Sequence, residues 1–592
     1  MEVKQQIKTA ITNALKELGL PAGRQGIEGI EPYIEHPKLS SHGDYSSNIA
    51  MAIFGNKELG IRNKGFKSPL ELGQKIASIF NSQVSTLNFL DRAEAITPGF
   101  INFWLSEQQL IDTLRNVLTE KDGYGKSDSL KGERIMVEYA HPNTHKEMHI
   151  GHMRTLITGE ALARIFSYGR AHVFRANYQG DIGPHVAKAI FGVQKLLSDR
   201  GVTLEDISKK SNREKARFLG EAYVIGNKEY DAHKSKIDGL NAKLYSKVAD
   251  IEEIYKTTRQ WSLDYFDDLY KKFDTTFDRL FFESEVSDCG KAIVLKNVGK
   301  VFEESEGAVI FPGKKYGLHN RVFVTAAGYP TYEGKDICLG FEQYKAFPFD
   351  RNIHVVASEQ TGYFRVVLKA LELLDPEKFK GKEHHLSMGM VHLVGRKMSS
   401  RTGEVLTVDW LVDTVKSSVA KLMEEGRIKT QEREAVTHAI AIGAIKYSVL
   451  RVGTGQDVAF DIDKSVSLDG DSGPYVQYTF ARTQSVLAKI KVQSSKIKTI
   501  NQNVNILENE ELQLLRLLTK FPEVVQEAAK SFSPSLLCIY LFDLSQAFNL
   551  FYQKHPILES ANSGFRVALT AAVGQTIKNS LNLLGIKAPE RM

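Results

Sequence analysis

The stretch IMVEYAHPNTHKEMHIGHMRT, residues 135–155, joins a short apolar run, a polar loop and the start of a helix. Its first five residues are typical of a buried parallel strand. Pro142 lies in the loop, and a helix is expected to begin near Met153. Apolar residues recur at helical spacing over 156–166, and 172–176 has the character of a second strand. The stretch therefore predicts a βαβ unit.

Alternation of strands and helices continues further along the chain. Residues 353–358 and 388–394 are predicted as strands, with a helix over 364–374 between them. The segment near 199–300 is highly charged with helical periodicity, which indicates a helical insertion. The pattern predicts an α/β fold class in which a Rossmann-type doubly wound parallel sheet is split by that insertion.

The length of the chain indicates several domains. At 592 residues it exceeds what one core usually supports, and roughly 150 residues per domain suggests about four. We expect a small N-terminal α/β domain over 1–120 and the Rossmann-type domain over 121–410. A connecting helical segment over 411–465 and an all-α helical bundle over 466–592 complete the prediction.

The composition is that of an ordinary folded protein, with 42% hydrophobic and 25% charged residues. Lysine and arginine exceed aspartate and glutamate by 77 to 71, a mild excess that permits polyanion binding without indicating it. The longest apolar stretches, such as 536–542, are far shorter than the ~20 residues that cross a bilayer. Residues 1–20 are expected to form a domain's first helix and not a targeting peptide.

The three cysteines are Cys289, Cys338 and Cys538. Their wide separation predicts neither a disulfide framework nor a local zinc site. A reducing cytoplasm is the location that fits best.

The loop over 140–152 is expected to leave the first strand at its carboxyl end, where ligands bind to open parallel sheets. Backbone N–H groups at the following helix N-terminus can face a phosphate, and Gly151 allows close approach. His149 and His152 can donate hydrogen bonds to charge that develops on an α-phosphate. This loop predicts one half of a nucleotide-activating site.

A second glycine-flanked loop over 395–403 also follows a predicted strand. It offers Lys397, between Arg396 and Arg401, to the β- and γ-phosphates of ATP, and its glycines would let it close. Two loops of this type, each after a strand, favour a phosphate site over ordinary surface loops.

A metal site is the rival interpretation of the first loop, because three of its histidines have helix-face spacing with a carboxylate among them. The order His-Glu-x-x-His is absent, Pro142 and Gly151 indicate a loop, and Lys146 would repel a dication. No protein-held metal is therefore predicted. The residues concerned are His145, Glu147, His149 and His152.

Residues 137–155 resemble the class I aminoacyl-tRNA synthetases, and in particular the arginyl-tRNA synthetases. The resemblance continues through 175–183, and 397–403 is similar to the family's second signature loop. Two further regions at each end extend it: 43–48 and 98–102 look like the family's N-terminal additional domain, and 472–482 and 584–592 like its helical anticodon-binding domain.

The resemblance implies an ATP-dependent ligase that forms arginyl-adenylate and transfers arginine to the terminal adenosine of tRNA(Arg). It implies that the 2′-hydroxyl is the first acceptor and that tRNA binds before adenylate forms. Mg²⁺ is expected with ATP, and no zinc. The implied catalytic residues are His149, His152, Lys397 and Lys146. The implied ATP-binding residues are Gly151, His149, His152, Lys397, Met398, Ser399 and Ser400.

An arginine site must hold a charged planar guanidinium, which requires carboxylates and an aromatic or hydroxyl partner. By resemblance, Glu138 and Asp336 occupy the acidic positions with Tyr332 beside them. Asn143 and Gln360 would hold the backbone groups of the amino acid. Such a site does not obviously need proofreading, because a shorter or uncharged analogue leaves buried carboxylates unpaired.

The sequence departs from the family at Gly334-Lys335, where the family usually has Thr-Arg. Tyr332 and Asp336, four apart, could share one face of a helical turn, although Gly334 disfavours a helix. The local geometry is therefore the open question at this position.

The implied partners are tRNA(Arg), L-arginine and ATP, for a monomer with no membrane association. Aromatic residues followed by a lysine-containing run could stack on unpaired bases and meet phosphates. The implied tRNA-binding residues are Tyr475, Gln477, Tyr478, Arg482, Asn102 and Met592.

Two other functions remain open. A related nucleotidyltransferase, or a synthetase for another amino acid, would share both phosphate loops. A non-catalytic RNA-binding protein derived from a synthetase would show degraded signature loops, whereas both are intact here.

Overall fold

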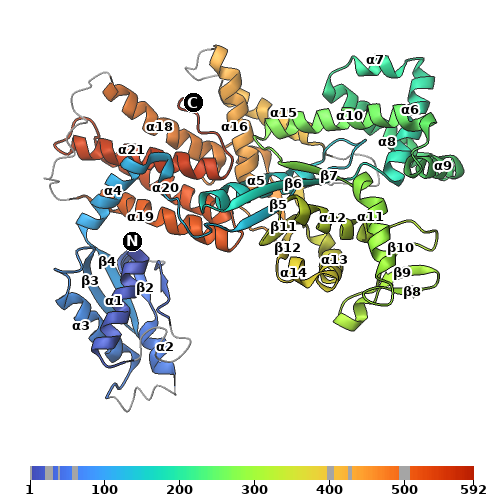
Figure 1. Cartoon of the computed structure of the whole chain (residues 1–592). Coiled ribbons are helices and arrows are strands. Elements are labelled where there is room, and N and C mark those ends of the chain that lie inside the picture. Colours follow the sequence, from blue (N-terminus) through green and yellow to red (C-terminus); the bar gives the residue numbers. More distant parts are fainter. Residues whose placement is uncertain are drawn as a thin grey trace. The chain divides into compact units, whose positions relative to one another are not determined.

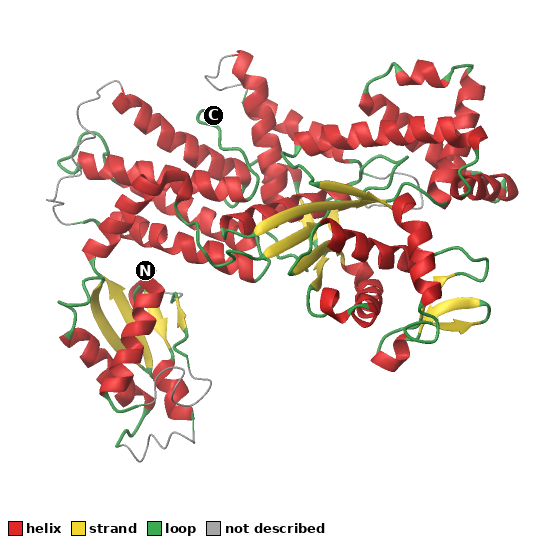
Figure 2. Ribbon diagram, viewed as in Figure 1, coloured by secondary structure: helices red, strands yellow, loops and turns green. Residues whose placement is uncertain are grey.

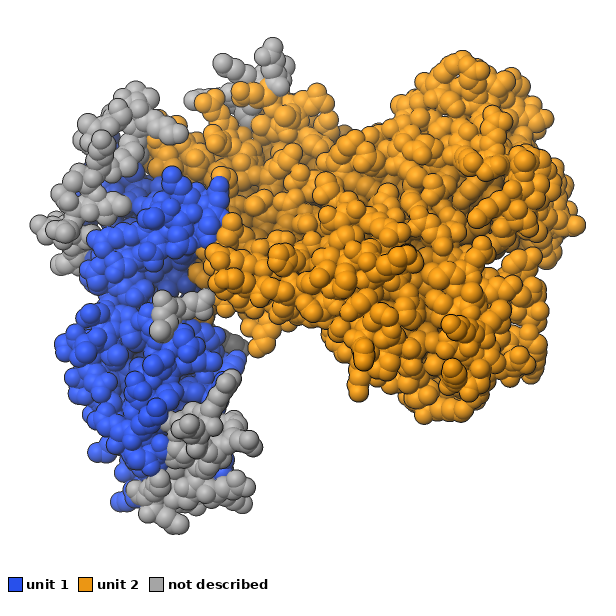
Figure 3. Space-filling view, in the orientation of Figure 1, with its two compact units in different colours: residues 1–124, 493–520, 550–575 blue, residues 125–492, 521–549, 576–592 orange. Residues whose placement is uncertain are grey.

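The computed structural model describes most of the chain, namely residues 3–20, 31–37, 40–56, 65–395, 406–423, 430–491 and 507–592. The second signature loop therefore lies outside the described residues. Two compact units make up the chain (Figure 3): residues 1–124, 493–520 and 550–575 form one, and residues 125–492, 521–549 and 576–592 form the other.

The first unit contains a four-stranded antiparallel sheet with the strand order β1-β2-β4-β3. Its strands are β1 (Ile34–Glu35), β2 (Tyr45–Ser47), β3 (Leu90–Ile96) and β4 (Phe100–Leu105). Its N-terminal helices are α1 (Val3–Glu17), α2 (Ile49–Gly55), α3 (Pro69–Ser82) and α4 (Glu107–Glu120). Buried Asp44 ties this sheet together, because it accepts from the Leu105 N–H at 2.8 Å and pairs with Arg516 at 2.8 Å.

The second unit is built on a five-stranded parallel sheet with the order β12-β11-β5-β6-β7. The order reverses between β5 and β11, as in a doubly wound sheet, and ligands bind such sheets at that point. The predicted α/β class is confirmed (Figure 2). The strands are β5 (Arg134–Glu138), β6 (His172–Gln179), β7 (Arg279–Phe282), β11 (Arg351–Ala357) and β12 (Glu383–Met388).

Helices cover both faces of this sheet (Figure 1). Helix α5 (Ile150–Tyr168) covers the face of Tyr139, where Gly159 leaves room for the tyrosine ring: a Cβ on Gly159 would lie 2.2 Å from it. On the other face lie α11 (Glu283–Lys296), α12 (Tyr332–Ala346) and α13 (Thr361–Leu374). Adjacent residues of a strand point to opposite faces, so Glu138 faces α12.

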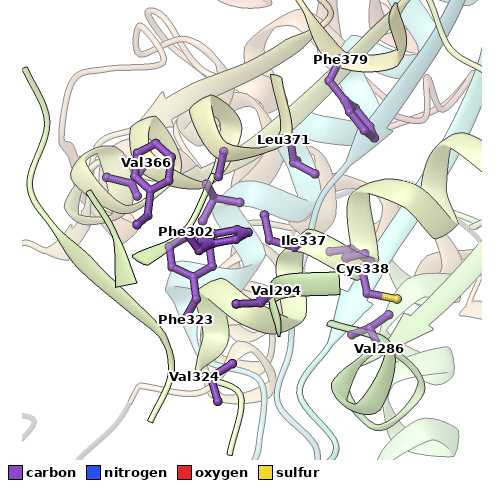
Figure 4. Close-up of a cluster of buried hydrophobic side chains, with 14 of the residues drawn as sticks. Val286, Val294, Phe302, Phe323, Val324, Ile337, Cys338, Val366, Leu371 and Phe379 are labelled. Atoms are coloured by element: carbon purple, nitrogen blue, oxygen red, sulfur yellow. The ribbon is translucent and has the colours of Figure 1, made fainter. Parts of the chain in front are cut away.

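An apolar cluster fixes α12 against its neighbours (Figure 4). It brings Val286 and Val294 of α11 together with Ile337 of α12 and Leu371 of α13. A small antiparallel sheet, β8 (Glu303–Ser305), β9 (Ala308–Phe311) and β10 (Arg321–Val324), adds Phe323 to the cluster. This sheet is not anticipated by the sequence analysis.

Charged helices follow β6, as the sequence predicts. They are α6 (Pro184–Arg200), α7 (Leu204–Ser208), α8 (Asn212–Lys228), α9 (Lys234–Tyr245) and α10 (Ala249–Lys272). The range given to the insertion is too long, because 279–282 form the edge strand β7 of the parallel sheet. The strand expected over 388–394 is also wrong: β12 ends at Met388, and a separate short strand, β13 (Val391–Leu393), pairs with β14 (Val458–Phe460).

Further α-helices make up most of the rest of the described chain. They are α14 (Pro376–Phe379), α15 (Val408–Leu422), α16 (Thr430–Leu450), α17 (Ile462–Ser465), α18 (Gly473–Lys491), α19 (Asn509–Lys530), α20 (Ser535–Lys554) and α21 (Ser563–Leu583). Among the described residues, no helix is long and apolar enough to cross a membrane.

The cysteines do not all behave as expected. Cys289 of α11 and Cys338 of α12 form a disulfide, whereas Cys538 is buried and unpaired. The expectation of no disulfide fails because the pairing depends on a close helix contact. A Cβ on Gly290 would lie 2.2 Å from the Gly334 carbonyl oxygen, so only glycine lets α11 and α12 approach so closely.

Helices α6 and α8 also meet at glycine. A Cβ on Gly192 would lie 1.9 Å from the Ala222 carbonyl oxygen, whereas one on Gly239 of α9 would meet nothing within 4 Å. Gly192→Ala should therefore lower the free energy of unfolding by ~1–3 kcal/mol through overpacking. Gly239→Ala is the matched control and should raise that free energy by up to ~1 kcal/mol through helix propensity.

Urea unfolding followed by Trp261 fluorescence measures both changes, because Trp261 is buried in the same cluster as Ala222. The other two tryptophans, Trp104 and Trp410, are replaced by phenylalanine in all three proteins. Equal stability of the Gly192→Ala chain and its parent would contradict the close helix contact.

Candidate active site

The first signature loop leads into α5 with two stacked histidines. His149 is the N-cap, and its Nδ1 accepts the Gly151 N–H at 3.1 Å. The His149 and His152 rings stack with centroids 3.7 Å apart. The helix begins three residues earlier than Met153, where the sequence placed it, so Gly151 and His152 lie in its first turn. The loop is therefore rigidly tied to the helix N-terminus.

Both histidines are neutral near pH 7. Burial, with Lys146 contributing, lowers the pKa of His149 to about 4, and burial lowers the pKa of His152 well below its usual range. Because Nδ1 of neutral His149 accepts a hydrogen bond, its proton resides on Nε2. His149 can therefore donate an N–H from Nε2 to a ligand without carrying charge.

A cavity of about 270 Å³ opens beside these histidines. His149, Gly151 and His152 line one side, and Gln360 with 388–391 lines another. It lies beyond the carboxyl ends of β5, β11 and β12, where a doubly wound sheet binds ligands. The structure thus brings three residues of the first loop together with Gln360.

Residues 406–408, which follow the second signature loop, form backbone hydrogen bonds with residues 148–150 at the end of the first signature loop. Ile150 N–H donates to the Leu406 carbonyl at 3.1 Å, and Val408 N–H donates to the Met148 carbonyl at 2.9 Å. Lys397, Met398, Ser399 and Ser400 themselves lie outside the described residues. The described residues 406–408, which follow that loop in sequence, lie next to His149.

The guanidinium of Arg154 holds the backbone near one wall of the cavity. The sequence does not predict this role. It is buried and donates to four backbone carbonyls, at distances of 2.6 to 3.3 Å. These carbonyls belong to Met390, Gly453, Thr454 and Gln456. Arg154 therefore fixes one wall of the cavity to α5.

Glu138 ends β5 with a side chain only 2% exposed. Its Oε1 lies 3.1 Å from His354 Nδ1, and its Oε2 accepts from Gln343. Burial would raise the pKa of Glu138, but His354, with help from His141 and Gln343, lowers it to about 2. Glu138 is therefore a carboxylate at all ordinary pH values.

The segment around Gly334-Lys335 is helical, with Thr331 as its N-cap. A Cβ on Gly334 would lie 2.3 Å from the Phe323 carbonyl oxygen, so glycine fits this packing and a larger residue does not. Lys335 is buried and pairs with Glu283 at 2.8 Å, and its ammonium lies 5.2 Å from the Tyr332 ring centroid. Gly334 and Lys335, where the sequence departs from the family pattern, thus each make specific packing or charge contacts in this structure.

Asp336 differs from Glu138 in its charge state. It accepts the Tyr363 hydroxyl at 2.6 Å, and burial raises its pKa to about 7, with Tyr363 opposing the rise. Tyr332, one turn earlier, is 53% exposed. Glu138 is therefore a permanent carboxylate and Asp336 titrates near neutral pH, and neither is among the residues that line the cavity.

Asn143 lies over Gly180, because a Cβ there would lie 2.2 Å from Asn143 Oδ1 and 3.1 Å from Glu283 Oε1. Lys146 lies elsewhere: its ammonium sits 4.0 Å from the centroid of the Tyr223 ring of α8, and it is not among the residues that line the cavity. It acts on the histidines only through its charge.

His145 is one of the residues of the rival metal interpretation. Both ring nitrogens of buried His145 are engaged, at 2.9 Å from the hydroxyls of Thr144 and Thr258. Within the described ranges, no group of three or more His, Cys, Asp or Glu side chains is arranged to hold a metal.

The predicted tRNA-binding residues have different environments. Tyr475 and Arg482 both contact Asn549, at 3.0 and 2.6 Å, and the Arg482 guanidinium lies 4.9 Å from the Tyr478 ring centroid. Gln477 is fully buried and donates to the Lys587 carbonyl at 2.7 Å, so it supports the C-terminal segment.

Asn102 and Met592 complete that set. Asn102 of β4 is buried in the first unit, and its Nδ2 atom has no hydrogen-bond partner among the described residues. Met592 is the final residue and is partly exposed in the second unit.

Four residues that contact Glu138, Asp336 or their partners were not predicted from the sequence: His354, Glu383, Gln343 and Tyr363. One signal was present, because His354 interrupts an apolar strand run. The others depend on which strands and helices become neighbours, as when β11 pairs with β5 and β12.

Known proteins resemble the whole chain. The model of the catalytic domain of class I (R) tRNA synthetases matches residues 113–462. The DALR anticodon binding domain model matches 476–592, and the arginyl tRNA synthetase N terminal domain model matches 5–105.

Individual relatives agree. An arginine–tRNA ligase of Treponema denticola is 34% identical over 515 residues, which cover 84% of this chain and 86% of the relative. One of Borrelia hermsii is 29% identical over the full length of both. The solved arginyl-tRNA synthetase of Thermus thermophilus has the same fold, with a TM-score of 0.79 and 24% identity over 100% of both chains. The catalytic-domain match spans more than half of the sequence, and the chain belongs to the class I arginyl-tRNA synthetases.

Proposed function

We propose that this chain joins L-arginine to tRNA(Arg) in two steps at the cavity beyond β5. The arginine carboxylate attacks the α-phosphorus of ATP, which gives arginyl-adenylate and releases pyrophosphate. The 2′-hydroxyl of the terminal adenosine of tRNA then attacks the arginyl carbonyl carbon and releases AMP. The observation that carries the proposal is the pair of neutral, stacked histidines at the N-terminus of α5, beside the cavity.

In the first step His149 and His152 would donate hydrogen bonds to the α-phosphate as negative charge develops on it. Gly151 places no side chain beside the two histidines. The N–H groups at the N-terminus of α5 favour binding of an anion there. Because the two rings are neutral, their contribution is directional hydrogen bonding and not charge neutralisation.

Positive charge for the β- and γ-phosphates is assigned to Lys397, with Met398, Ser399 and Ser400 completing that loop. This assignment rests on the sequence and on the pairing of 406–408 with 148–150. Mg²⁺ bound to the ATP phosphates would supply further charge. Lys146 is given a lesser electrostatic role, because it lies on Tyr223.

Glu138 and Asp336 are assigned to the guanidinium of arginine, with Tyr332 at the edge of the pocket. Arginine requires an anionic, bidentate partner, and a carboxylate that is already ionised at the end of β5 meets this requirement. Lys335 does not compete as a ligand for these carboxylates, because Glu283 holds it at 2.8 Å. Asn143 and Gln360 are assigned to the amino and carboxylate groups of the substrate.

We further propose that the helical region over 466–592 and the N-terminal region over 1–120 contact tRNA(Arg). Tyr475, Tyr478, Arg482, Asn102 and Met592 are the residues assigned to this contact, and Gln477 would act by holding the C-terminal segment. The domain bounds at 120, 410 and 465 are part of this proposal. We place the enzyme in the cytoplasm as a monomer.

ATP–pyrophosphate exchange with each amino acid, with and without tRNA(Arg), tests the function directly. Exchange is expected with arginine alone among the amino acids, and only when the tRNA is present. Exchange with another amino acid and none with arginine would overturn the assignment of substrate.

Asp336→Asn should lower kcat/KM for arginine by roughly 10- to 100-fold, the value of one hydrogen bond to a charged group. The KM for ATP should not change. Glu342→Gln is the matched control on α12, because the Glu342 carboxylate is partly exposed and pairs with Lys345. Unchanged arginine kinetics in the Asp336→Asn enzyme would remove Asp336 from the guanidinium site.

The KM for arginine should also depend on pH. Binding a cation favours ionised Asp336, whose pKa is about 7, so the KM should fall by about tenfold between pH 6 and pH 8. The KM for ATP should stay constant over this range because His149, with a pKa of about 4, remains neutral. A KM for arginine that is flat from pH 6 to pH 8 would contradict the assignment.

A further inference from the structure

A polar layer lies between the parallel sheet and α12. His354 of β11 is the direct register partner of Glu138 of β5, and Asn352 is the partner of Glu383 of β12. Residues paired in this way, and residues two apart on one strand, share a face. These four side chains therefore point toward α12, from which Gln343 reaches down to Glu138 and Asn352.

His354 bridges the two carboxylates. Its Nδ1 lies 3.1 Å from Glu138, and its Nε2 lies 2.8 Å from Glu383. Both ring nitrogens can donate to carboxylates only when the ring is an imidazolium. The three side chains are 7%, 2% and 3% exposed for His354, Glu138 and Glu383, so water does not replace these bonds.

This arrangement fixes the direction of Glu138. One of its oxygens faces His354 and the other faces Gln343, whose own oxygen accepts from Asn352 at 2.9 Å. A carboxylate has about four acceptor positions, so capacity remains for a guanidinium. His141, which lines the cavity, has its Nδ1 3.7 Å from Glu138 Oε1.

We propose that His354 and Glu383 are positioning residues for arginine specificity, which hold the Glu138 carboxylate in the orientation that receives the guanidinium. The inference rests on the proposed role of Glu138. Neither residue touches the substrate: His354 acts through Glu138, and Glu383 acts through His354.

The charge of the layer explains why two carboxylates surround one histidine. Burial raises the pKa of Glu383, and its hydrogen bond to His354 opposes that rise. With Glu383 ionised, Glu138, His354 and Glu383 carry a net charge of −1, which a bound guanidinium neutralises. A neutral isostere with a urea in place of the guanidinium, such as citrulline, would leave a buried negative charge without a partner and should be rejected. The layer therefore supports discrimination by charge as well as by shape.

The ionisation states agree with this geometry. Although burial opposes its charge, His354 has its pKa raised to about 10 by Glu138 and Glu383, and His354 in turn helps to lower the pKa of Glu138 to about 2. The other titratable groups that feel the charge of His354 are His141, Asp336, His384 and His385.

His354→Gln tests the inference in the full-length enzyme with tRNA(Arg). Loss of the imidazolium leaves Glu138 buried beside neutral groups, which raises its pKa and weakens its hold on arginine. The KM for arginine should rise at least tenfold, with kcat and the KM for ATP within about threefold of the parent. The ratio of variant to parent KM should be larger at pH 6 than at pH 8, because protonated Glu138 cannot bind the guanidinium.

His385→Gln is the matched control. His385 is the β12 register partner of His354 and stacks on Phe364, but it bonds the Val356 carbonyl at 3.3 Å and not Glu138. Its arginine KM and its discrimination between arginine and citrulline should stay at parent values. An equal KM rise in both variants would mean a general effect of disturbing the sheet and would overturn the inference.

Glu383→Gln provides a second route if His354→Gln does not fold. This variant keeps His354 beside Glu138 and removes only the negative charge that His354 Nε2 contacts. A smaller rise in the arginine KM, about three- to tenfold, is therefore expected. A parent-like KM and parent-like citrulline rejection in a folded Glu383→Gln enzyme would exclude Glu383, and the same result for His354→Gln would overturn the whole inference.

Glu138→Gln separates this inference from the proposed function. If Glu138→Gln leaves the arginine KM unchanged, the assignment of Glu138 fails and the inference falls with it. If Glu138→Gln raises the KM while His354→Gln does not, only the positioning role fails. When both hold, adding His354→Gln to Glu138→Gln should raise the KM by less than twofold, because the histidine acts through that carboxylate.

Discussion

Pairing of buried charge between the parallel sheet and α12 is the constraint on which the site depends. An ionised carboxylate buried without a partner is costly, and removal of one member of a buried pair is strongly destabilising. Glu138 and Glu383 share His354, and Glu283 holds Lys335. His354 and Lys335 are each held by internal carboxylates, so neither cation occupies the place proposed for the guanidinium.

The close contact between α11 and α12 makes this pairing geometrically feasible. Gly290 and Gly334 bring the helices to backbone contact, which places Lys335 within reach of Glu283 and Cys289 beside Cys338. Gly334 thus allows the close helix contact, and Lys335 pairs with Glu283 across it. Thr in place of Gly334 would press on the Phe323 carbonyl of β10, so the family's usual residue does not fit this packing without movement of the small sheet.

Local patterns predicted much of the structure. The strand, loop and helix over 135–168 follow from apolar runs and glycine placement, which depend on neighbours in sequence. His354 and Glu383 could not be assigned in this way, because their meaning arises when β11 is inserted between β5 and β12. The same holds for Arg154, whose carbonyl partners lie more than 230 residues away along the chain. Local patterns do not reveal a buried charged group whose partners are distant in sequence, and Glu138 was named only through the family resemblance.

The two halves of the site divide the electrostatic work. The described histidines at the α5 N-terminus are neutral, so they cannot offset the charge of a triphosphate, although they can direct N–H groups at one phosphorus. The second loop contains three basic residues, Arg396, Lys397 and Arg401. Neutral donors held by the fold would be in place before ATP binds, whereas positive charge is needed only until pyrophosphate leaves. Rigid donors on α5 and cations on a separate loop therefore suit a reaction whose leaving group carries away most of the negative charge.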